Sequence, residues 1–167
     1  MSRVVSIGAH PDDETAFAGG LLAKHVSERS DVQIICLTRG EGGELGEPPL
    51  CSVQELGAVR ERELRRAAAA LGATDVTFLD FVDPRIAVGE PGRPIDATHE
   101  ELTAAIGREI ERLRPDIVIT HGSNGEYGHP QHIATHQAVR QARRAPRGPL
   151  DASRCAGDAR THRLIRG

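Results

Sequence analysis

Aromatic side chains are scarce in this chain of 167 residues. Phenylalanine, tyrosine and tryptophan together make up 2% of it, and tryptophan is absent. So few aromatic rings provide little of the stacking surface on which proteins bind single-stranded nucleic acids. The formal net charge of -3 gives no overall attraction for nucleic acid either. We therefore expect a protein that does not bind nucleic acid.

Cysteines and long apolar runs are also few. Cys36, Cys51 and Cys155 are an odd number and lack the spacing of a metal site, so we predict free thiols in a reducing compartment. The longest apolar runs are far too short to cross a bilayer, and the first residues lack the pattern of a signal peptide. These absences predict a cytoplasmic protein without a membrane partner.

Short apolar stretches alternate along the chain with segments of helical periodicity. The expected strands are residues 3–9, 31–38, 75–81 and 116–121, and the expected helices are residues 14–29, 53–71 and 98–114 with a last one beginning at His129–Pro130. Thr98 and Glu101 have the spacing of a capping box. This alternation predicts an α/β protein, Rossmann-like, with three layers and a mostly parallel sheet.

The last part of the chain breaks this pattern. After residue 140 the sequence is rich in Arg and interrupted by Pro, Gly and Ser, without sustained periodicity. We therefore assign residues 1–140 to one domain and residues 141–167 to an irregular Arg-rich tail. A basic patch for nucleic acid or membrane is the less favoured interpretation of the tail, because it lacks interleaved aromatics and an amphipathic face.

Two clusters of polar side chains directly follow predicted strands. The first contains His10 and three acids at positions 12–14, and the second contains four histidines within residues 121–136. Carboxyl ends of parallel strands share one edge of a sheet, so we expect the clusters to meet. Histidine nitrogens and aspartate oxygens are common zinc ligands, and a catalytic zinc leaves one position open. A further carboxylate beside the ligands would act as general base.

Each cluster also has an ordinary interpretation. The acids at 12–14 fit a helix N-terminus, where the helix dipole favours negative charge. His129 and His132 alone would fit surface histidines. Metal-free nucleotide binding is a third interpretation, but the first strand is not followed by G-x-G-x-x-G, no P-loop is present, and the acids would repel phosphate. Both clusters at one sheet edge favour a metal site.

The stretches AHPDDE (9–14) and GHPQH (128–132) together resemble the PIG-L/LmbE-like zinc-dependent N-acetylglucosaminyl de-N-acetylase family. The resemblance extends to residues 37–46 and 59–73 and to the order of strands. It implies Zn²⁺ as cofactor and hydrolysis of an acetamide on a small N-acetylated amino sugar. The aglycone of that sugar, the metal used in the cell and the oligomeric state are not determined by the sequence.

The resemblance also implies roles for individual residues. The implied zinc ligands are His10, Asp13 and His132, the implied catalytic residues are Asp12 and His129, and the implied substrate contacts are Arg60, Tyr127 and Asp83. Asp12 would be the general base, and His129 would stabilise the oxyanion or protonate the leaving amine. Arg60 equally fits an exposed helix residue. His136, one helical turn after His132, is the alternative ligand, and His121 and His25 are expected to be structural or to face solvent.

Two features depart from the family pattern. Gln131 stands where the family commonly has Asp, and a neutral amide orients His129 without raising its pKa. We therefore expect weaker catalysis without loss of the metal. The family also continues beyond the length of this chain, so we expect it to be truncated at the C-terminus relative to the family. The alternative to an active hydrolase is a weakened or inactive relative that still binds metal and sugar.

Overall fold

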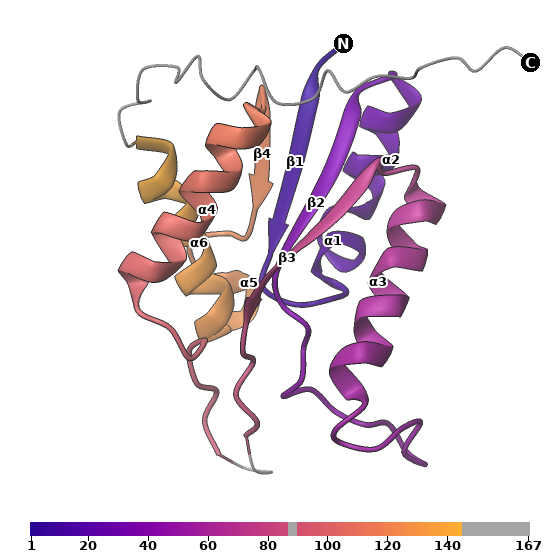
Figure 1. The fold of residues 1–167 in the computed structure, drawn as a ribbon, viewed down its shortest axis with the longest axis vertical. Helices are drawn as coiled ribbons and strands as arrows, with labels where there is room; N and C mark the ends of the chain where they lie inside the picture. The colour runs from indigo at the N-terminus through magenta and orange to yellow at the C-terminus, as the bar shows by residue number, and fades with distance from the viewer. Residues whose placement is uncertain (87–89, 145–167) are drawn as a thin grey trace, which may run out of the picture.

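The computed structural model of the chain describes residues 1–86 and 90–144. Its centre is a four-stranded sheet in the order β3-β2-β1-β4, with every neighbouring pair parallel. The strands are β1 (Arg3–Gly8), β2 (Asp31–Thr38), β3 (Asp75–Phe81) and β4 (Ile117–Thr120). Helices cover both faces of the sheet (Figure 1). The predicted three-layer α/β fold is therefore confirmed.

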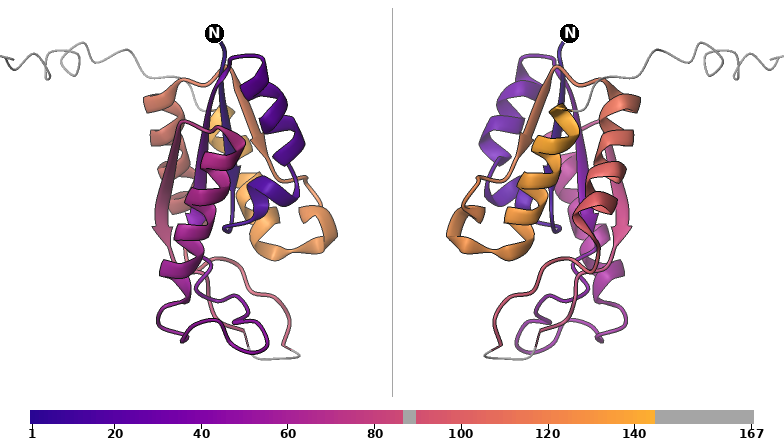
Figure 2. Two further views of the ribbon diagram at one scale, coloured as in Figure 1. Left: turned by 90° about the vertical axis from the view of Figure 1, so that its right-hand side faces the viewer. Right: turned by 90° about the vertical axis from the view of Figure 1, so that its left-hand side faces the viewer.

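The two faces of the sheet bury different sets of side chains. The helices are α1 (Asp13–Ala16), α2 (Gly19–Ser27), α3 (Leu56–Leu71), α4 (His99–Leu113), α5 (Gly125–Gly128) and α6 (Pro130–Arg144). α4 and α6 lie against one face, and α2 and α3 lie against the other (Figure 2). Val5 and Ile7 pack towards α4 and α6, whereas Val4, which precedes Val5, packs with Leu22 of α2. Each such buried side chain stabilises the fold by about 1.5–3 kcal/mol.

Local sequence explains where the helices begin and end, and one predicted helix is divided in two. The helix expected over residues 14–29 is two helices, because the chain leaves helical geometry at Ala18 (φ -131°) and continues through Gly19–Gly20, which favour helix weakly. The Thr98–Glu101 capping box is present and starts α4. α3 ends at Leu71, and the following Gly72 caps it with a φ of +83°, which suits glycine.

The C-terminal part of the prediction needs one correction. Residues 141–144 continue α6, so the expected irregular tail does not begin at 141. The rest of that tail, residues 145–167, lies outside the described residues, as does Cys155. Cys36 and Cys51 are free thiols. In the described ranges no helix is both long and apolar enough to cross a membrane.

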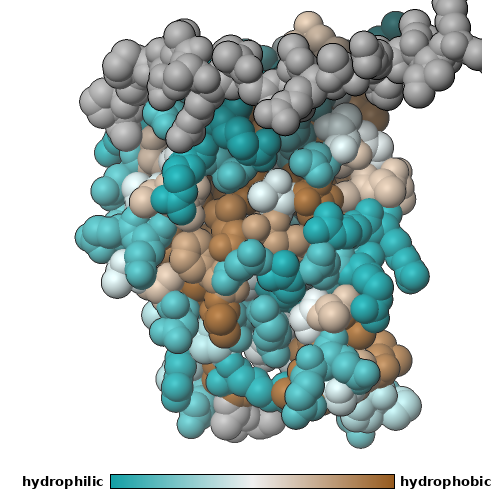
Figure 3. Space-filling model, in the orientation of Figure 1, coloured by the Kyte–Doolittle hydropathy of each residue, from teal (hydrophilic) through white to brown (hydrophobic). Residues whose placement is uncertain are grey.

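Strand pairing brings the two polar clusters together at one edge of the sheet. β1 pairs directly with β4, with Val4 opposite Ile117 and Ile7 opposite Thr120. The loops that follow these two strands therefore emerge side by side. At the other side of the sheet, β3 is an edge strand, and apolar surface gathers over it between α3 and α4 (Figure 3). The guanidinium groups of Arg39 and Arg65 lie over the Phe78 ring at 5.0 and 5.4 Å and cover part of this edge.

Candidate metal centre

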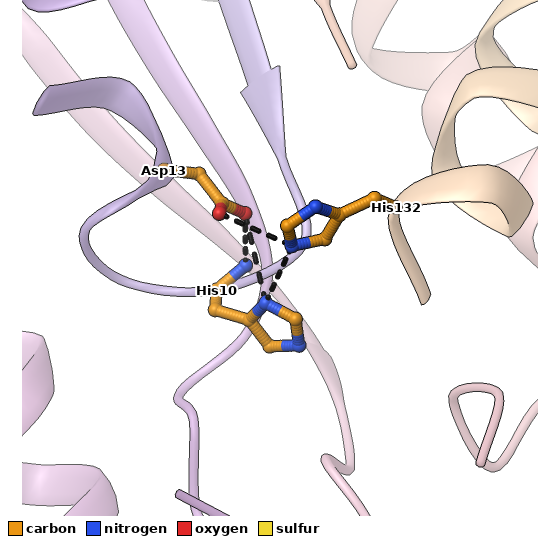
Figure 4. Close-up of side chains that lie close together, drawn as sticks. All are labelled: His10, Asp13 and His132. Carbon is orange, nitrogen blue, oxygen red and sulfur yellow. Dashed lines mark hydrogen bonds and ion pairs between the residues drawn. The ribbon is translucent and has the colours of Figure 1, made fainter. Parts of the chain in front are cut away.

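Three side chains from two distant parts of the sequence converge at the ends of β1 and β4 (Figure 4). His132 Nε2 lies 3.3 Å from His10 Nδ1 and 3.3 Å from Asp13 Oδ1. His10 Nδ1 lies 3.7 Å from Asp13 Oδ2. All three residues are buried, and their ligand atoms form one group that a metal ion would fit. The predicted meeting of the two clusters is confirmed in this geometry.

Hydrogen bonds fix which nitrogen of His10 faces this group. The Gln131 amide Nε2 donates to the buried Asp83 Oδ1 at 2.8 Å, so its Oε1 faces the other way. That oxygen lies 2.7 Å from His10 Nε2 and accepts its hydrogen. The neutral His10 ring therefore has its lone pair on Nδ1, the atom that faces Asp13 and His132.

The same argument applies to His132. Its Nδ1 lies 2.9 Å from Glu126 Oε2, and a carboxylate only accepts, so Nδ1 carries the hydrogen. The lone pair of the neutral ring is then on Nε2. Burial opposes a charge on His132, but the Asp13 and Glu126 carboxylates outweigh it and raise the pKa of the ring above its ordinary value.

The carboxylate of Asp13 has one oxygen satisfied by protein donors. Its Oδ2 accepts from the backbone N–H groups of Ala9 and His10, both at 2.8 Å, and lies 3.1 Å from His121 Nε2. Burial alone would raise the pKa of Asp13, but its contacts with the His121 and His132 rings hold it well below its usual range. Asp13 is therefore ionised, and its Oδ1 is the oxygen turned towards His132.

The donor set fits zinc. Two histidine nitrogens and a carboxylate oxygen are ligand types that zinc takes, and three protein ligands leave a fourth position open. Two ligands of a tetrahedral zinc with bonds of about 2.0–2.1 Å lie about 3.3–3.4 Å apart, and two of the three separations here are 3.3 Å. His10 Nδ1, His132 Nε2 and the Asp13 carboxylate all present lone pairs to one another. They therefore repel unless a cation or a proton lies between them.

Asp12 lies beside the ligands without joining them. Its backbone is strained, with φ 114°, and its side chain is 68% exposed. Asp12 Oδ2 accepts from Arg60 Nη2 at 2.9 Å. Partial burial of the carboxyl raises the pKa of Asp12 above its ordinary value, although the Arg60 charge opposes this. A solvent-accessible carboxylate with a raised pKa suits proton transfer.

The side chains of Arg60 and Asp83 are both held by contacts within the protein. Arg60 is 18% exposed, and its guanidinium bonds to Asp12, to Pro11 O and to Gly40 O, joining the loops after β1 and β2. Asp83 is 7% exposed beneath Gln131. Both contacts favour positioning roles, and the predicted contacts of these residues with substrate remain predictions.

His129 and Tyr127 pack beside His132 and are both more exposed than the three buried residues of the ligand group. The His129 ring stacks on His132 at 4.3 Å between centroids, and its Nδ1 accepts from the Gln131 backbone N–H at 3.3 Å. Burial, with the neighbouring His10 and His132 rings, lowers the pKa of His129 to about 4. At neutral pH the ring is therefore uncharged, with its hydrogen on Nε2. Tyr127 is 71% exposed and packs edge-on against both rings.

Two expectations about this region are wrong. The Gln131 side chain does not orient His129, because it is buried and points from the start of α6 towards His10 and Asp83. His136 is not brought into the ligand group, because its Nδ1 donates to the backbone O of His121 at 2.7 Å. The i, i+4 spacing puts His136 on the same side of α6 as His132, one helical turn later.

Of two further residues at the site, His121 belongs to the predicted cluster after β4 and Glu126 was not predicted. His121 is 6% exposed and its Nε2 lies 3.1 Å from Asp13 Oδ2. Of the two expectations for His121, a structural role fits and exposure to solvent does not. Glu126 lies between Gly125 and Tyr127 in the short α5, and no sequence pattern pointed to it.

The chain is similar to a described family along most of its length. The family model for PIG-L, described as GlcNAc-PI de-N-acetylase, matches residues 5–143. A "1D-myo-inositol 2-acetamido-2-deoxy-alpha-D-glucopyranoside deacetylase" of Rhodococcus jostii (strain RHA1) is 37% identical over 153 residues, which cover 84% of this chain and 52% of the relative. The chain thus spans about half the length of the curated relatives it matches.

Solved structures share the fold. N,N'-diacetylchitobiose deacetylase from Pyrococcus horikoshii has a TM-score of 0.68 and 25% identity, covering 84% of this chain and 49% of that one. GalB, a 4-carboxy-2-hydroxymuconate hydratase from Pseudomonas putida KT2440, has a TM-score of 0.69 and 26% identity, covering 86% and 56%. The same architecture therefore occurs in a deacetylase and in a hydratase.

Proposed function

This chain belongs to the PIG-L family of GlcNAc-PI de-N-acetylases, and we propose that it is a zinc-dependent hydrolase that removes the acetyl group from an N-acetylglucosamine-type substrate. The observation that carries the proposal is the convergence of His10 Nδ1, His132 Nε2 and the Asp13 carboxylate, two of the three separations being 3.3 Å. These three residues would hold the ion. When bound, zinc activates water and polarises a carbonyl at neutral pH.

Asp12 is the proposed general base. It is adjacent in sequence to the ligand Asp13, yet its own carboxylate is solvent-accessible and absent from the ligand group. Its raised pKa makes it a better proton acceptor than an ordinary aspartate. Arg60 holds the accepting carboxylate in place from the side of α3. Asp12 would take the proton of the attacking water and return it to the leaving sugar amine.

His129 and Tyr127 are the proposed contacts to the reacting amide. His129 is uncharged near neutral pH and has its Nε2–H free of the Gln131 contact. A fixed neutral donor of this kind stabilises a developing oxyanion without first losing a proton. Tyr127 packs against the same ring, and its exposed side chain leaves it available to the acyl group.

Acetate release with two acetamido sugars tests the proposal. The substrates are the glucosaminyl-inositol acetamide named for the relatives and N,N'-diacetylchitobiose. We expect the zinc-loaded wild type to release acetate, Asp12→Ala to lose turnover while keeping about one zinc per chain, and His132→Ala to lose the zinc. Glu28→Gln, at the exposed end of α2, is the control and should match wild type. Full turnover in Asp12→Ala would show that the base is assigned wrongly.

A second candidate is a relative that binds metal and sugar without turnover. One observation favours it: the Gln131 side chain is bound to His10 rather than assisting His129. One zinc per chain with no acetate released from either sugar would support this candidate. The cytoplasmic location of the protein, expected from its sequence, remains a prediction.

A further inference from the structure

We infer that Glu126 is a positioning residue, which holds His132 with its Nε2 lone pair directed at the metal group. The inference rests on the proposed metal site. Glu126 lies outside the ligand group of His10, Asp13 and His132, and its carboxylate acts through the far nitrogen of the His132 ring. Carboxylates behind a ligating histidine commonly fix its tautomer and ring orientation.

The backbone at Glu126 is held in an unfavourable conformation. Its φ of 59° and ψ of -64° lie near a rare and strained γ-turn geometry, although neighbouring Gly125 and Gly128 adopt positive φ without cost. A residue with a side chain is disfavoured at such a position relative to glycine. The contacts of the side chain must therefore offset that cost.

The Glu126 carboxylate makes three contacts. Its Oε1 accepts from the Gly122 backbone N–H at 2.8 Å. Its Oε2 lies 2.9 Å from His132 Nδ1 and 3.1 Å from His121 Nδ1. The side chain is 21% exposed, so these bonds are partly shielded from water. A single carboxylate oxygen, Oε2, thus contacts both imidazole rings.

The imidazole rings of His121 and His132 lie between the carboxylates of Glu126 and Asp13 and contact both. His121 and His132 stack with centroids 3.9 Å apart and planes 11° from parallel. On their other side, His121 Nε2 lies 3.1 Å from Asp13 Oδ2 and His132 Nε2 lies 3.3 Å from Asp13 Oδ1. The histidine pair is therefore held between two carboxylates, one in the ligand group and one behind it. A turn of either ring would break contacts at both ends.

Hydrogen bonding explains these contacts better than a second cation does. His121, Glu126 and His132 also form a group that a metal would fit by distance. The two Nδ1 atoms, however, lie at the same end of the stacked pair, both beside Glu126 Oε2, and His121 Nε2 at the other end accepts from the Ala9 backbone N–H at 3.2 Å, which leaves the hydrogen of the neutral His121 ring on Nδ1. A single carboxylate oxygen accepting from two parallel N–H groups fits that arrangement.

The variant Glu126→Gly separates the positioning role of the carboxylate from an effect on folding. Glu126→Gly removes the carboxylate and relieves the backbone, so we expect the protein to fold, while its zinc Kd rises about 10- to 100-fold. Glu126→Gln keeps one acceptor oxygen and should give a smaller rise. Arg29→Gly is the matched control, because Arg29 also has positive φ (62°) and lies at the exposed end of α2. Its zinc Kd should equal that of wild type.

The tautomer of His132 is a second readout that needs neither metal nor activity. In metal-free wild type, at a pH high enough to keep the ring neutral, long-range ¹H–¹⁵N spectra should show His132 with its hydrogen on Nδ1, and Glu126→Gly should shift it towards Nε2. An unchanged zinc Kd in Glu126→Gly, an Nε2–H tautomer in wild type, or a second zinc that depends on Glu126 would each overturn the inference. If wild type bound no zinc at all, the proposed function would fail, and the tautomer would still decide the role of Glu126.

Discussion

The Gln131 amide oxygen lies 2.7 Å from His10 Nε2, and this contact determines which nitrogen of His10 faces Asp13 and His132. The amide can do so because its other end donates to the buried Asp83. Gln131 is therefore the middle member of a chain of hydrogen bonds from His10 through Gln131 to Asp83.

A double-mutant cycle across this chain of hydrogen bonds should reveal coupling between Gln131 and Asp83. Gln131→Glu sets two carboxylates against each other, and we expect it to lower the free energy of unfolding by about 1–3 kcal/mol. Adding Asp83→Asn supplies a donor to the new carboxylate and should restore about 1 kcal/mol or more. Urea unfolding of the metal-free proteins measures both effects. Strictly additive changes would show that the two side chains do not interact.

Zinc should stabilise the fold of the wild type through His132. A ligand that binds only the folded state adds about 2.7 kcal/mol of stability when its free concentration is about 100 times Kd. We therefore expect the melting temperature to rise with zinc and to return after a chelator is added. His132→Ala should show no such rise, and a rise of equal size there would place the metal elsewhere.

Arg60→Ala should lower kcat more than it raises KM. The guanidinium holds Asp12 and the Pro11 carbonyl in the structure, so its loss should misplace the proposed base and reduce kcat about tenfold or more. Steady-state kinetics with an acetamido sugar separates the two constants. A raised KM at unchanged kcat would instead support the sugar contact predicted from sequence.

Asp31 should make stability depend on acid pH. The hydrogen bond from Thr74 Oγ1, together with those from Arg3 and Gln33, lowers the pKa of Asp31 in the folded state. Its stabilising contribution is thus present above the unfolded pKa of about 3.9 and is lost as pH falls through the lower folded value.

The matching variant is Asp31→Asn, which should be less stable than wild type at pH 7 by about 1 kcal/mol or less, since exposed ion pairs contribute little. The gap should close towards pH 2 in thermal unfolding. Glu28→Gln serves as the control in the same pH series. A gap that stays constant with pH would mean that Asp31 is not ionised in these contacts.

The sequence determined the elements and the edge at which the site lies. Apolar patterns located all four strands, Thr98 and Glu101 marked the start of α4, and the polar clusters after β1 and β4 pointed to one sheet edge. These features depend on local propensity and on the geometry common to parallel sheets, so a single sequence carries them. The glycines that divide the expected helix over residues 14–29 were visible, but their effect was not predicted.

Only the tertiary structure decided how the side chains are paired. Whether Gln131 contacts His10 or His129, whether Arg60 is held by Asp12, and whether His121 joins the site all depend on groups brought together by strand register. Glu126 is the clearest case, because its role follows from one backbone conformation and two stacked rings. Spacing along a chain fixes which edge a residue reaches, whereas directions of lone pairs and N–H bonds are fixed only by the neighbours that accept or donate there.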